Sequence, residues 1–568
     1  MSDPVRARVV TLSDFNLATL NGLMANDPGE PPVDVVSTDF GQVQPLLLDA
    51  DAACWRDRPA GAVVWVRPEA AAPAFGALRR FEPVPGDAIS GEVDGFADML
   101  IAAADRVGSL FVPTWTLPLS ERGLGFLDLT LESGVRGTLA RMNLQLAGRL
   151  SGHPTIHLLD ASRWLRAAGA GATSAKLWYM AKVPFTNAVF EMAVQEIKAA
   201  LRGIGGRARK LIVVDLDDTL WGGVVGDEGW ESLRLGGHDA VGEAYADFQR
   251  ALRDLTNRGI VLGIVSKNTE EVALEAIREN PEMVLGLDDF AGWRINWNDK
   301  ARNIADLTAE LNLGLDSVVF IDDSAFERGR VREALPEVLV PDWPGDPLLY
   351  RERLTSLDCF DAPSLSEEDR ARAGMYAAER RRDAARGEVG SADAWLASLG
   401  LEVQVEDLDR ANLARAAQLL NKTNQMNLRT RRMTETELSE WAASPRRRVL
   451  AFRVADRFGD SGLTGLASIE VENGRAELCD FVMSCRVMGR GVERAIVSAV
   501  VEAARQLGAS SLAATHIPTA RNEPCLRFFE GSGFVPGSDE GSFTRDPLDP
   551  YEVPEHIALH RGVGEGSG

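Results

Sequence analysis

The sequence predicts a multidomain α/β protein. Its centre is a doubly wound parallel α/β core, flanked by an N-terminal α/β domain and a C-terminal α+β domain. At 568 residues, the chain is too long for one hydrophobic core. Short, nearly continuous apolar segments alternate with amphipathic helical patterns through the first two domains, which is typical of parallel sheets covered by helices. From residue 401 strand and helix patterns are mixed, which favours an α+β unit.

The composition is that of an ordinary globular protein, with 45% apolar and 26% charged residues. A net charge of −23 argues against non-specific binding to nucleic acid or anionic membranes. The short basic runs at 429–432 and 446–448 could form a local basic patch, but we favour their interpretation as solvated loop arginines. The five cysteines lack metal-ligand spacing, which indicates a reducing compartment, and no signal-peptide or membrane-spanning pattern is found. We therefore expect a cytoplasmic protein that binds neither nucleic acid nor membrane.

The N-terminal domain is expected at 1–205. Strand patterns at 6–15, 61–69 and 155–161 are separated by helical stretches such as 137–150. This alternation predicts an α/β fold.

The core domain is expected at 206–345 and begins with "RKLIVVDLDDT". Strands and amphipathic helices then alternate as in a doubly wound sheet. The segments that carry this pattern are the helix 242–259, the strand 260–268, the helices 270–280 and 300–313, and the strand 317–323.

The remaining chain is divided into three parts. Residues 346–400 are expected to form a helical linker, in which Ser364 and Glu367 make a capping box. The C-terminal domain is expected at 401–548, and a tail at 549–568 ends in "RGVGEGSG", a composition typical of disorder.

Three carboxylates follow the apolar segment "KLIVV" within four positions: Asp215, Asp217 and Asp218. Like charges this close raise one another's pKa and cost stability unless a cation or a phosphoryl group uses them. A strand that ends in Asp-x-Asp-x-Thr resembles the way the haloacid dehalogenase (HAD) superfamily presents a nucleophilic carboxylate. The resemblance implies that Asp215 attacks phosphorus and forms an aspartyl-phosphate. It implies that Asp217 is the acid/base, which protonates the leaving oxygen and then activates water, whereas Asp218 caps or orients the turn.

Further residues of the HAD pattern follow in order. Ser266, at the end of the next strand pattern, would hold the phosphoryl oxygens. Lys300 would stabilise the charge on the nucleophile and the phosphoryl group; the less favoured alternative for this residue taken alone is a surface lysine at the start of a helix. Mg²⁺ is implied because two anions approach each other only when their charge is neutralised. Its expected ligands are four carboxylates: Asp215, Asp217, Asp322 and Asp323.

A glycine-rich segment, "WGGVVGDEGWESLRLGGHD" at 221–239, lies between the carboxylates and the next helix. It is too short to form a large cap domain. An uncapped site can admit a bulky or carrier-tethered substrate, or can be closed by a neighbouring domain.

A second glycine-rich turn, "SCRVMGRG", precedes a long helical pattern in the C-terminal domain. Small residues there let backbone N–H groups meet a pyrophosphate at a helix N-terminus. Together with "ARNEPCLRFFEGSGF" at 520–534, this turn resembles the acyl-CoA-binding core of GNAT-type N-acyltransferases. Cys485 is a candidate acyl-accepting thiol or, alternatively, a small buried apolar residue. The resemblance places four residues at the arm of CoA or phosphopantetheine: Arg486, Gly489, Gly491 and Asn522.

The complete arrangement resembles the FkbH-like proteins. Besides the HAD and GNAT motifs, the resemblance rests on "LWYMAKVPFTNAVF" (177–190), "NKTNQMNLRTRR" (421–432) and "DRFGDSGLTG" (456–465). Proteins of this family are associated with polyketide and related pathways. They take a phosphorylated three-carbon acyl donor, 1,3-bisphosphoglycerate, remove phosphate, and load glyceryl onto acyl carrier protein as a thioester.

This resemblance implies Mg²⁺ and the phosphopantetheine arm of acyl carrier protein (or CoA) as cofactors. It implies acyl carrier protein and the acyl donor as partners. The C-terminal domain would receive the carrier arm. Phosphate would be handled by the HAD residues: Asp215, Asp217, Ser266, Lys300 and Asp322.

One position departs from the family pattern. Many members have a cysteine just before the serine of the "SKN" segment, a candidate for carrying the acyl group, where this chain has Val265. The acyl group would then pass directly to the carrier thiol, be relayed by Cys485, or come from a different donor.

The N-terminal domain resembles a degenerate SGNH hydrolase. Ser13 and Asp14 are out of the required pattern, and His157 and Asp160 stand in the reverse of the required order. We therefore expect a structural or docking unit without hydrolase activity.

Two other functions fit the same motifs. One is a phosphatase coupled to CoA-dependent N- or O-acylation of a sugar or small metabolite. The other is a docking scaffold for a carrier protein with residual phosphatase activity.

Overall fold

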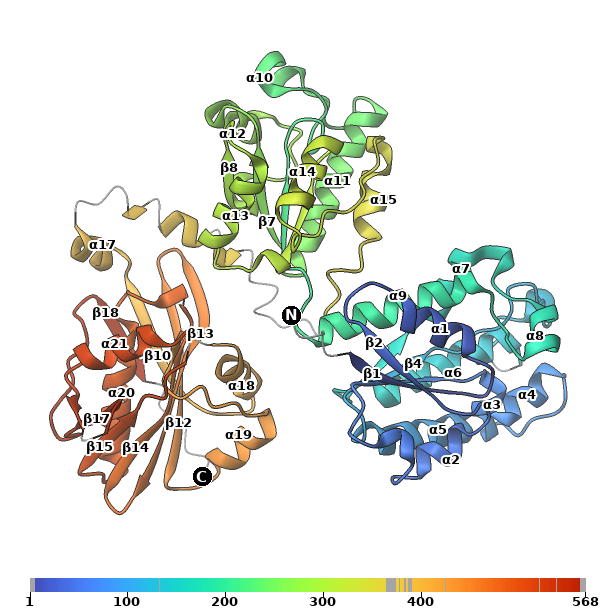
Figure 1. Cartoon of the computed structure of the whole chain (residues 1–568), viewed down its shortest axis with the longest axis horizontal. Coiled ribbons are helices and arrows are strands. Elements are labelled where there is room, and N and C mark those ends of the chain that lie inside the picture. Colours follow the sequence, from blue (N-terminus) through green and yellow to red (C-terminus); the bar gives the residue numbers. More distant parts are fainter. Residues whose placement is uncertain are drawn as a thin grey trace. The chain divides into compact units, whose positions relative to one another are not determined.

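A computed structural model gives the fold of the chain (Figure 1). The predicted capping box at Ser364 and Glu367 and the side chain of Cys485 lie outside what it describes. The chain divides into two compact units, the first formed by 1–209 and 356–364 and the second by 210–355 and 365–568. The described residues are 6–131, 133–363, 374–376, 378–382, 385–386, 391–423, 425–519, 521–537 and 539–561.

The first unit contains a five-stranded parallel sheet with the order β2-β1-β3-β4-β5. Its strands are β1 (Ala7–Ser13), β2 (Val33–Ser37), β3 (Gly61–Trp65), β4 (Leu110–Pro113) and β5 (Ile156–Leu159). Its main helices are α1 (Ala18–Asn26), α2 (Val43–Leu48), α5 (Ala88–Ala104), α6 (Val135–Leu150), α7 (Ala161–Ala168), α8 (Ala175–Ala181) and α9 (Asn187–Ile204).

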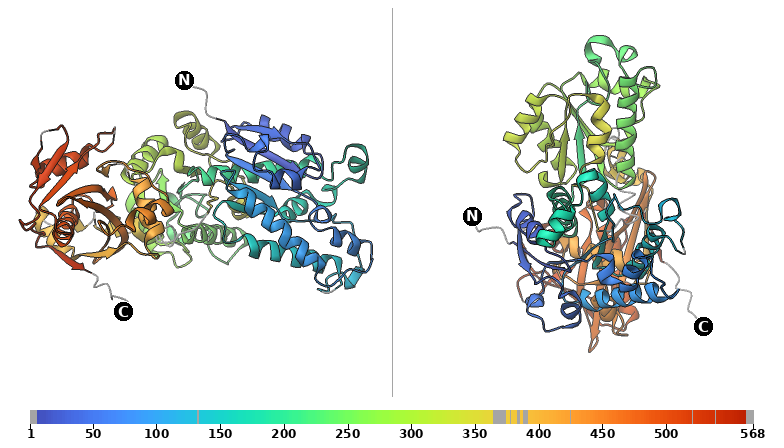
Figure 2. Two further views of the ribbon diagram at one scale, coloured as in Figure 1. Left: turned by 90° about the horizontal axis from the view of Figure 1, so that it is seen from below. Right: turned by 90° about the vertical axis from the view of Figure 1, so that its right-hand side faces the viewer.

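Both faces of this sheet are buried. Val10 and Val64 face a core that α5 and α6 complete, whereas their neighbours Val9 and Val63 face a core with α1 and α9. Figures 1 and 2 show α1 and α9 on one side of the strands and α2 and α5 on the other. The near-continuous apolar strands of the sequence follow from this, because both side-chain directions point into a core.

The second unit begins with a four-stranded parallel sheet of order β8-β7-β6-β9. Helices α13 and α14 pack on one face, and Figure 1 shows α11 on the other side of β7. The strands are β6 (Leu211–Val214), β7 (Val261–Ser266), β8 (Phe290–Ile295) and β9 (Val318–Ile321). The helices are α10 (Val225–Glu228), α11 (Ala240–Asn257), α12 (Glu270–Glu279), α13 (Lys300–Glu310), α14 (Ala325–Ala334) and α15 (Tyr350–Thr355).

The last part of the second unit is a mixed, mainly antiparallel sheet. Strand β14 is antiparallel to β13 but parallel to β15, and α20 connects the parallel pair. The strands are β10 (Leu401–Asp407), β11 (Met426–Asn427), β12 (Arg447–Asp456), β13 (Gly459–Glu472), β14 (Arg475–Met483), β15 (Ser511–Thr515), β16 (Val535–Pro536), β17 (Ser542–Arg545) and β18 (Ile557–Arg561). The helices are α17 (Ala392–Ser398), α18 (Leu413–Lys422), α19 (Glu435–Ala442), α20 (Val492–Gln506) and α21 (Glu523–Gly531).

One element of this sheet lies beyond the C-terminal domain boundary expected at residue 548. Strand β18 pairs in parallel with β10, from Leu401 opposite Ile557 to Val405 opposite Arg561. Its backbone thereby covers the edge of β10, which explains why part of the expected tail is ordered into the sheet.

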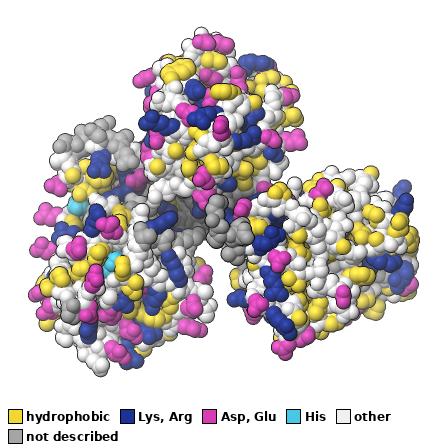
Figure 3. Space-filling view, in the orientation of Figure 1, with side chains coloured by type: hydrophobic (Ala, Val, Ile, Leu, Met, Phe, Trp, Pro, Cys, Tyr) yellow, Lys and Arg dark blue, Asp and Glu magenta, His cyan; other side chains and the backbone are white. Residues whose placement is uncertain are grey.

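The surface carries both signs of charge. On the face drawn in Figure 3, acidic and basic side chains are intermixed among hydrophobic ones. Within the described residues, no helix is both long and apolar enough to cross a bilayer.

Candidate active site

The nucleophile candidate stands at the carboxyl end of a buried strand. All four residues of β6 are fully buried, and Asp215 follows directly. The Asp215 N–H donates to the Ile321 carbonyl at 3.0 Å, so β6 and β9 end side by side. This register brings the carboxylates that follow the two strands to the same edge of the sheet.

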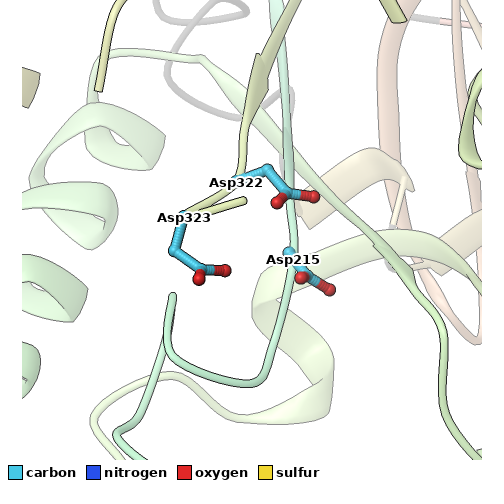
Figure 4. A group of neighbouring side chains, drawn as sticks. All are labelled: Asp215, Asp322 and Asp323. Atoms are coloured by element: carbon cyan, nitrogen blue, oxygen red, sulfur yellow. The ribbon is translucent and has the colours of Figure 1, made fainter. Parts of the chain in front are cut away.

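Three carboxylates meet at this edge. Asp215, Asp322 and Asp323 each offer one oxygen, and these oxygens lie within 4.8 Å of one another. Figure 4 shows the side chains of Asp322 and Asp323, from the end of β9, close to that of Asp215. The Oδ1 atom of Asp215 is buried and has no hydrogen-bond partner among the described residues. Clustered carboxylate oxygens, one of them unsatisfied, are the donor set of a hard divalent cation, so these residues fit Mg²⁺.

Lys300 neutralises part of this negative charge. Its Nζ lies 2.8 Å from Asp215 Oδ2 and 2.6 Å from Asp322 Oδ2. It begins α13, and its side chain is only 4% exposed, so it is not a surface lysine. Burial works against the ammonium charge, but Asp215 and Asp322 outweigh it and raise the pKa of Lys300. Burial and the charge of Asp215 raise the pKa of Asp322, against the opposing effect of Lys300.

Asp217 is held apart from the three clustered carboxylates. Its Oδ1 accepts hydrogen bonds from Trp221 Nε1 at 2.9 Å and from the Val225 N–H at 3.1 Å. Its Oδ2 accepts one from Asn268 Nδ2 at 2.9 Å. Burial raises the pKa of Asp217, although the bonds from Val225 and Trp221 oppose that shift. A fixed carboxyl with a raised pKa suits an acid/base; its expected role as a metal ligand stays a prediction.

The turn between Asp215 and the flap has its own support. Asp218 adopts a left-handed backbone conformation with φ of 53°. Its side chain accepts from the Gly223 N–H at 2.9 Å, as expected for a turn-orienting residue. Its carbonyl oxygen accepts hydrogen bonds from the hydroxyls of Tyr245 and Tyr350, each at 3.2 Å. The left-handed conformation is costly for an aspartate, and these bonds stabilise it.

Ser266 and Val265 occupy adjacent positions with different surroundings. Ser266 ends β7, the strand next to β6, and is 2% exposed. Val265 is fully buried in the core with Val213, Phe320 and Ile304. Successive side chains of a strand point to opposite faces, so position 265 faces the core under α13.

Two positions that the sequence analysis did not single out support the site. Asn268 is the last residue of the "SKN" segment that begins at Ser266, and its position just after Ser266 is a signal that could have identified it. Tyr350 lies in the segment expected to be a linker, where no local pattern points to the site.

The sequence-predicted residues of the C-terminal sheet lie around the start of α20 and α21. Gly489 and Gly491 have positive φ angles of 74° and 84°, as a tight turn before α20 requires. Asn522 is fully buried at the start of α21. The cysteines whose side chains are described are all buried, and burial raises their pKa: Cys54, Cys359, Cys479 and Cys525.

The N-terminal candidates lie on strands that are not neighbours, because β3 and β4 separate β1 from β5. The Phe15 N–H donates to Ser13 Oγ at 3.1 Å. The backbone N–H and the Nε of Arg67 both donate to the Asp14 carboxylate. His157 lies against Phe111 on β5, and Asp160 caps α7. Each of these side chains therefore has a local structural partner.

Comparison with solved structures identifies a neighbour that covers most of the chain. The chain is similar to the N-terminal part of the protein BF1531 from Bacteroides fragilis, at 27% sequence identity and a TM-score of 0.57. The match covers 63% of this chain and 95% of that one. That structure contains a phosphatase domain complexed with Mg.

Two further matches fall on about a quarter of the chain. The GNAT domain of S. lividans PAT is 16% identical, covering 25% of this chain and 89% of its own, with a TM-score of 0.21. A Desulfovibrio desulfuricans protein assigned to the GNAT family of acetyltransferases is 15% identical, covering 26% of this chain and 99% of its own, with the same TM-score of 0.21. TM-scores this low carry no argument about the fold or activity of this chain. No protein-family model and no curated protein matches the chain.

Proposed function

We propose that the chain is a Mg²⁺-dependent phosphoryl-transfer enzyme of HAD type that hydrolyses a phosphate ester through an aspartyl-phosphate on Asp215. The observation that carries this proposal is the buried, unpartnered Oδ1 of Asp215 beside Asp322 and Asp323, with Lys300 on its other oxygen. The similarity to a structure with a Mg-bound phosphatase domain supports it.

The roles follow from the contacts. A carboxylate oxygen of Asp215 attacks phosphorus, the bond from phosphorus to the ester oxygen breaks, and Asp217 gives its proton to that oxygen. Asp217 then takes a proton from water, which attacks phosphorus and releases inorganic phosphate while Asp215 is regenerated. Lys300 holds the Asp215 carboxylate and offsets the charge of the phosphoryl group. Bound Mg²⁺ would neutralise the charge between the phosphoryl oxygens and the carboxylates.

The more specific function is that of the FkbH-like proteins: removal of phosphate from 1,3-bisphosphoglycerate and loading of glyceryl onto acyl carrier protein. The acyl phosphate and the C3 phosphate of this donor must then be removed by two different reactions. Attack by Asp215 at the acyl phosphate would release a free carboxylate, which cannot form a thioester without a new source of energy. The carrier thiolate therefore attacks the acyl carbon and expels inorganic phosphate, whereas the C3 phosphate ester is transferred to Asp215 and then to water.

The surroundings of the site favour a tethered acceptor. The segment between Asp217 and α11 contains only the one-turn helix α10 and a short 3₁₀ turn (Trp230–Ser232), so it forms no cap domain. The side chain at position 265 faces the core. A cysteine there would point away from the site, so its replacement by Val265 takes no acyl-carrying thiol from the site. Direct transfer to the carrier thiol is therefore the simplest route.

Intact-mass spectrometry of holo acyl carrier protein tests this function. The carrier is incubated with enzyme, Mg²⁺ and 1,3-bisphosphoglycerate, and its mass is compared with that from the Asp215→Asn variant. We expect a glyceryl adduct with wild type and a phosphoglyceryl adduct, or none, with Asp215→Asn. A dephosphorylated glyceryl adduct that survives Asp215→Asn would contradict the role of Asp215. Absence of any adduct, with acetyl transfer from acetyl-CoA to an amine, would favour the CoA-dependent alternative.

A further inference from the structure

The C-terminal sheet has a place where two parallel strands separate. Strands β14 and β15 pair from Arg475 opposite Ser511 to Leu478 opposite Ala514. At Cys479 the register of β14 against β13 shifts by a bulge, and β15 ends at Thr515. Diverging strands leave backbone N–H and C=O groups on both facing edges, and such groups need partners when they are buried.

The chain itself fills this gap with β11. Met426 pairs with Met483 and Asn427 with Val482 in antiparallel register. The Leu428 N–H donates to the Phe481 carbonyl at 3.1 Å, and the Leu428 carbonyl accepts from the Ile517 N–H at 2.9 Å. One short segment thus satisfies backbone groups on both sides of the gap.

The inserted segment is anchored by side chains as well. Asn522 Nδ2 donates to the carbonyls of Asn427 and Ile517, each at 2.9 Å, and its Oδ1 accepts from the Thr519 N–H at 2.7 Å. The three side chains of the segment at 426–428 are at most 2% exposed. Every polar atom of the Asn522 side chain that could meet a ligand is therefore bonded to the chain's own backbone.

Two arginines that follow the segment attach it to β14. Arg429 forms an ion pair with Glu477, and Arg431 forms one with Asp480. Asp480 is 1% exposed and also accepts from Ser468 Oγ. Removal of the segment would take Arg431 from Asp480, which is costly because Asp480 is buried, and would leave Glu477 with Arg475, at 3.9 Å, as its ion-pair partner.

The start of α20 is occupied in a similar way. The Gly489 N–H donates to Glu493 Oε1 at 2.8 Å, so a carboxylate of the chain takes a position where an anion would bind. Pro554 and His556 lie within 3.4 Å of a Cβ added at Gly491. The Arg490 guanidinium donates to Glu379 at 2.7 Å.

We infer that β11 is a permanent strand of this sheet and that the gap between β14 and β15 is closed to the arm of CoA or phosphopantetheine. Such an arm carries two amides and a phosphate or pyrophosphate. The edge of β14 at 481–483 and the Ile517 N–H, which would bind the amides, are satisfied by β11 and Leu428, and the Gly489 N–H before α20 is already bonded to Glu493. The C-terminal sheet is then no CoA-dependent acyltransferase site. The inference is independent of the proposed phosphatase, since it concerns only this sheet, but it excludes this gap as the place where the C-terminal domain would receive the carrier arm.

Hydrogen exchange measured by mass spectrometry on the full-length chain tests the closure, with CoA as the probe. We expect slow exchange across 425–431, unchanged by millimolar CoA. Asn522→Ala should speed that exchange by at least an order of magnitude, because it removes the anchor of Asn427. The control Asn26→Ala removes an exposed side-chain hydrogen bond to the Gly22 carbonyl in the first unit and should leave 425–431 unchanged.

Two outcomes would overturn the inference. One is faster exchange of 425–431 on addition of CoA, which would show that β11 leaves the gap. The other is exchange in this segment of the wild-type chain as fast as that of an unstructured peptide. Calorimetric binding of CoA with unchanged exchange of 425–431 would place CoA outside the gap and supports the closure.

Discussion

Lys300 joins Asp215 to Asp322 through a single buried ammonium group, 2.8 Å from the first carboxylate and 2.6 Å from the second. The two carboxylates come from different strands, and Lys300 comes from the helix after a third. This bridge fixes the nucleophile and leaves one of its oxygens without a hydrogen-bond partner among the described residues. The first prediction concerns this bridge.

Replacing Lys300 by Met removes the bridge and leaves two buried carboxylates facing each other. We expect kcat for phosphate-ester hydrolysis to fall at least a hundredfold. Without Mg²⁺ the free energy of unfolding should fall by about 3 kcal/mol, the usual cost of breaking a buried ion pair. Steady-state kinetics and urea unfolding measure the two effects. Lys176→Met, at an exposed lysine, is the control and should change neither; wild-type kcat in Lys300→Met would contradict the assigned role.

The acid/base role of Asp217 predicts a dependence on the leaving group. With p-nitrophenyl phosphate, whose leaving group needs no proton, Asp217→Asn should still be phosphorylated but should hydrolyse the aspartyl-phosphate slowly. We expect a burst of one equivalent of p-nitrophenolate and then turnover slowed by about 10²–10⁴-fold. Stopped-flow absorbance measures both phases.

Asp218→Asn is the matched control for Asp217→Asn. Its amide oxygen can still accept from the Gly223 N–H, and the backbone carbonyl that binds Tyr245 and Tyr350 is unchanged. We expect nearly wild-type kinetics. An equal loss in both variants would show that the turn, and not the acid/base function, limits the rate.

The carboxylate cluster predicts stabilisation by Mg²⁺. At a concentration one hundred times its dissociation constant, Mg²⁺ should stabilise the fold by about 2.7 kcal/mol. Asp322→Asn and Asp323→Asn should each reduce the Mg²⁺-dependent rise in melting temperature, and EDTA should abolish activity. The single variant Asp316→Asn serves as a control outside the cluster. If Mg²⁺ raises the melting temperature of Asp323→Asn as much as that of the wild-type chain, the Asp323 side chain is excluded as a ligand.

The fourth prediction concerns the pH dependence of stability in the first unit. Lys198 is 2% exposed and binds Asp27 through its Nζ at 2.5 Å. Burial raises the pKa of Asp27, but hydrogen bonds from Lys198 and the Gly29 N–H outweigh it and lower the pKa below 3.8. A lowered carboxyl pKa stabilises the fold above pH 3.8, and this stabilisation is lost as the pH falls through the lower value.

Lys198→Met should therefore destabilise the first unit at neutral pH. It should also make the free energy of unfolding decrease less as the pH falls into the acid range. Urea unfolding between pH 3 and 7 measures the change. Arg207→Met is the control because its partner Glu30 is as exposed as Arg207 itself, at 61% each. If Arg207→Met reduces the acid dependence of the free energy of unfolding as much as Lys198→Met does, the effect does not come from the buried pair.

The sequence predicted the centre of the site because its chemistry is local. Asp215 follows a short apolar strand, and Ser266, Lys300 and Asp322 follow in the order that a parallel sheet with a common edge requires. Asn268 adjoins one of these segments. The support from Tyr350 is not predictable in this way, because it comes from a residue distant in sequence and is decided by tertiary packing.

The role of the segment at 425–431 could not be predicted either. A two-residue strand has no hydrophobic period, and "QMNLRT" has the appearance of an ordinary loop. Its place is set by the unsatisfied edges of β14 and β15, which exist only after the sheet has formed. The same applies to the contact of Asn522 with β11, in which its amide donates to the Asn427 carbonyl; its expected place at a ligand stays a prediction.

The central claim, a phosphoryl group carried by Asp215, is tested most directly by peptide-resolved mass spectrometry of acid-quenched enzyme. The Asp217→Asn variant is mixed with Mg²⁺ and a phosphate-ester donor, because slow hydrolysis lets the intermediate accumulate. We predict one phosphoryl group on the peptide that contains Asp215, and none when Asp215→Asn is added to the same chain. A phosphoryl group on another residue, or release of phosphate at the wild-type rate by Asp215→Asn alone, would contradict the account.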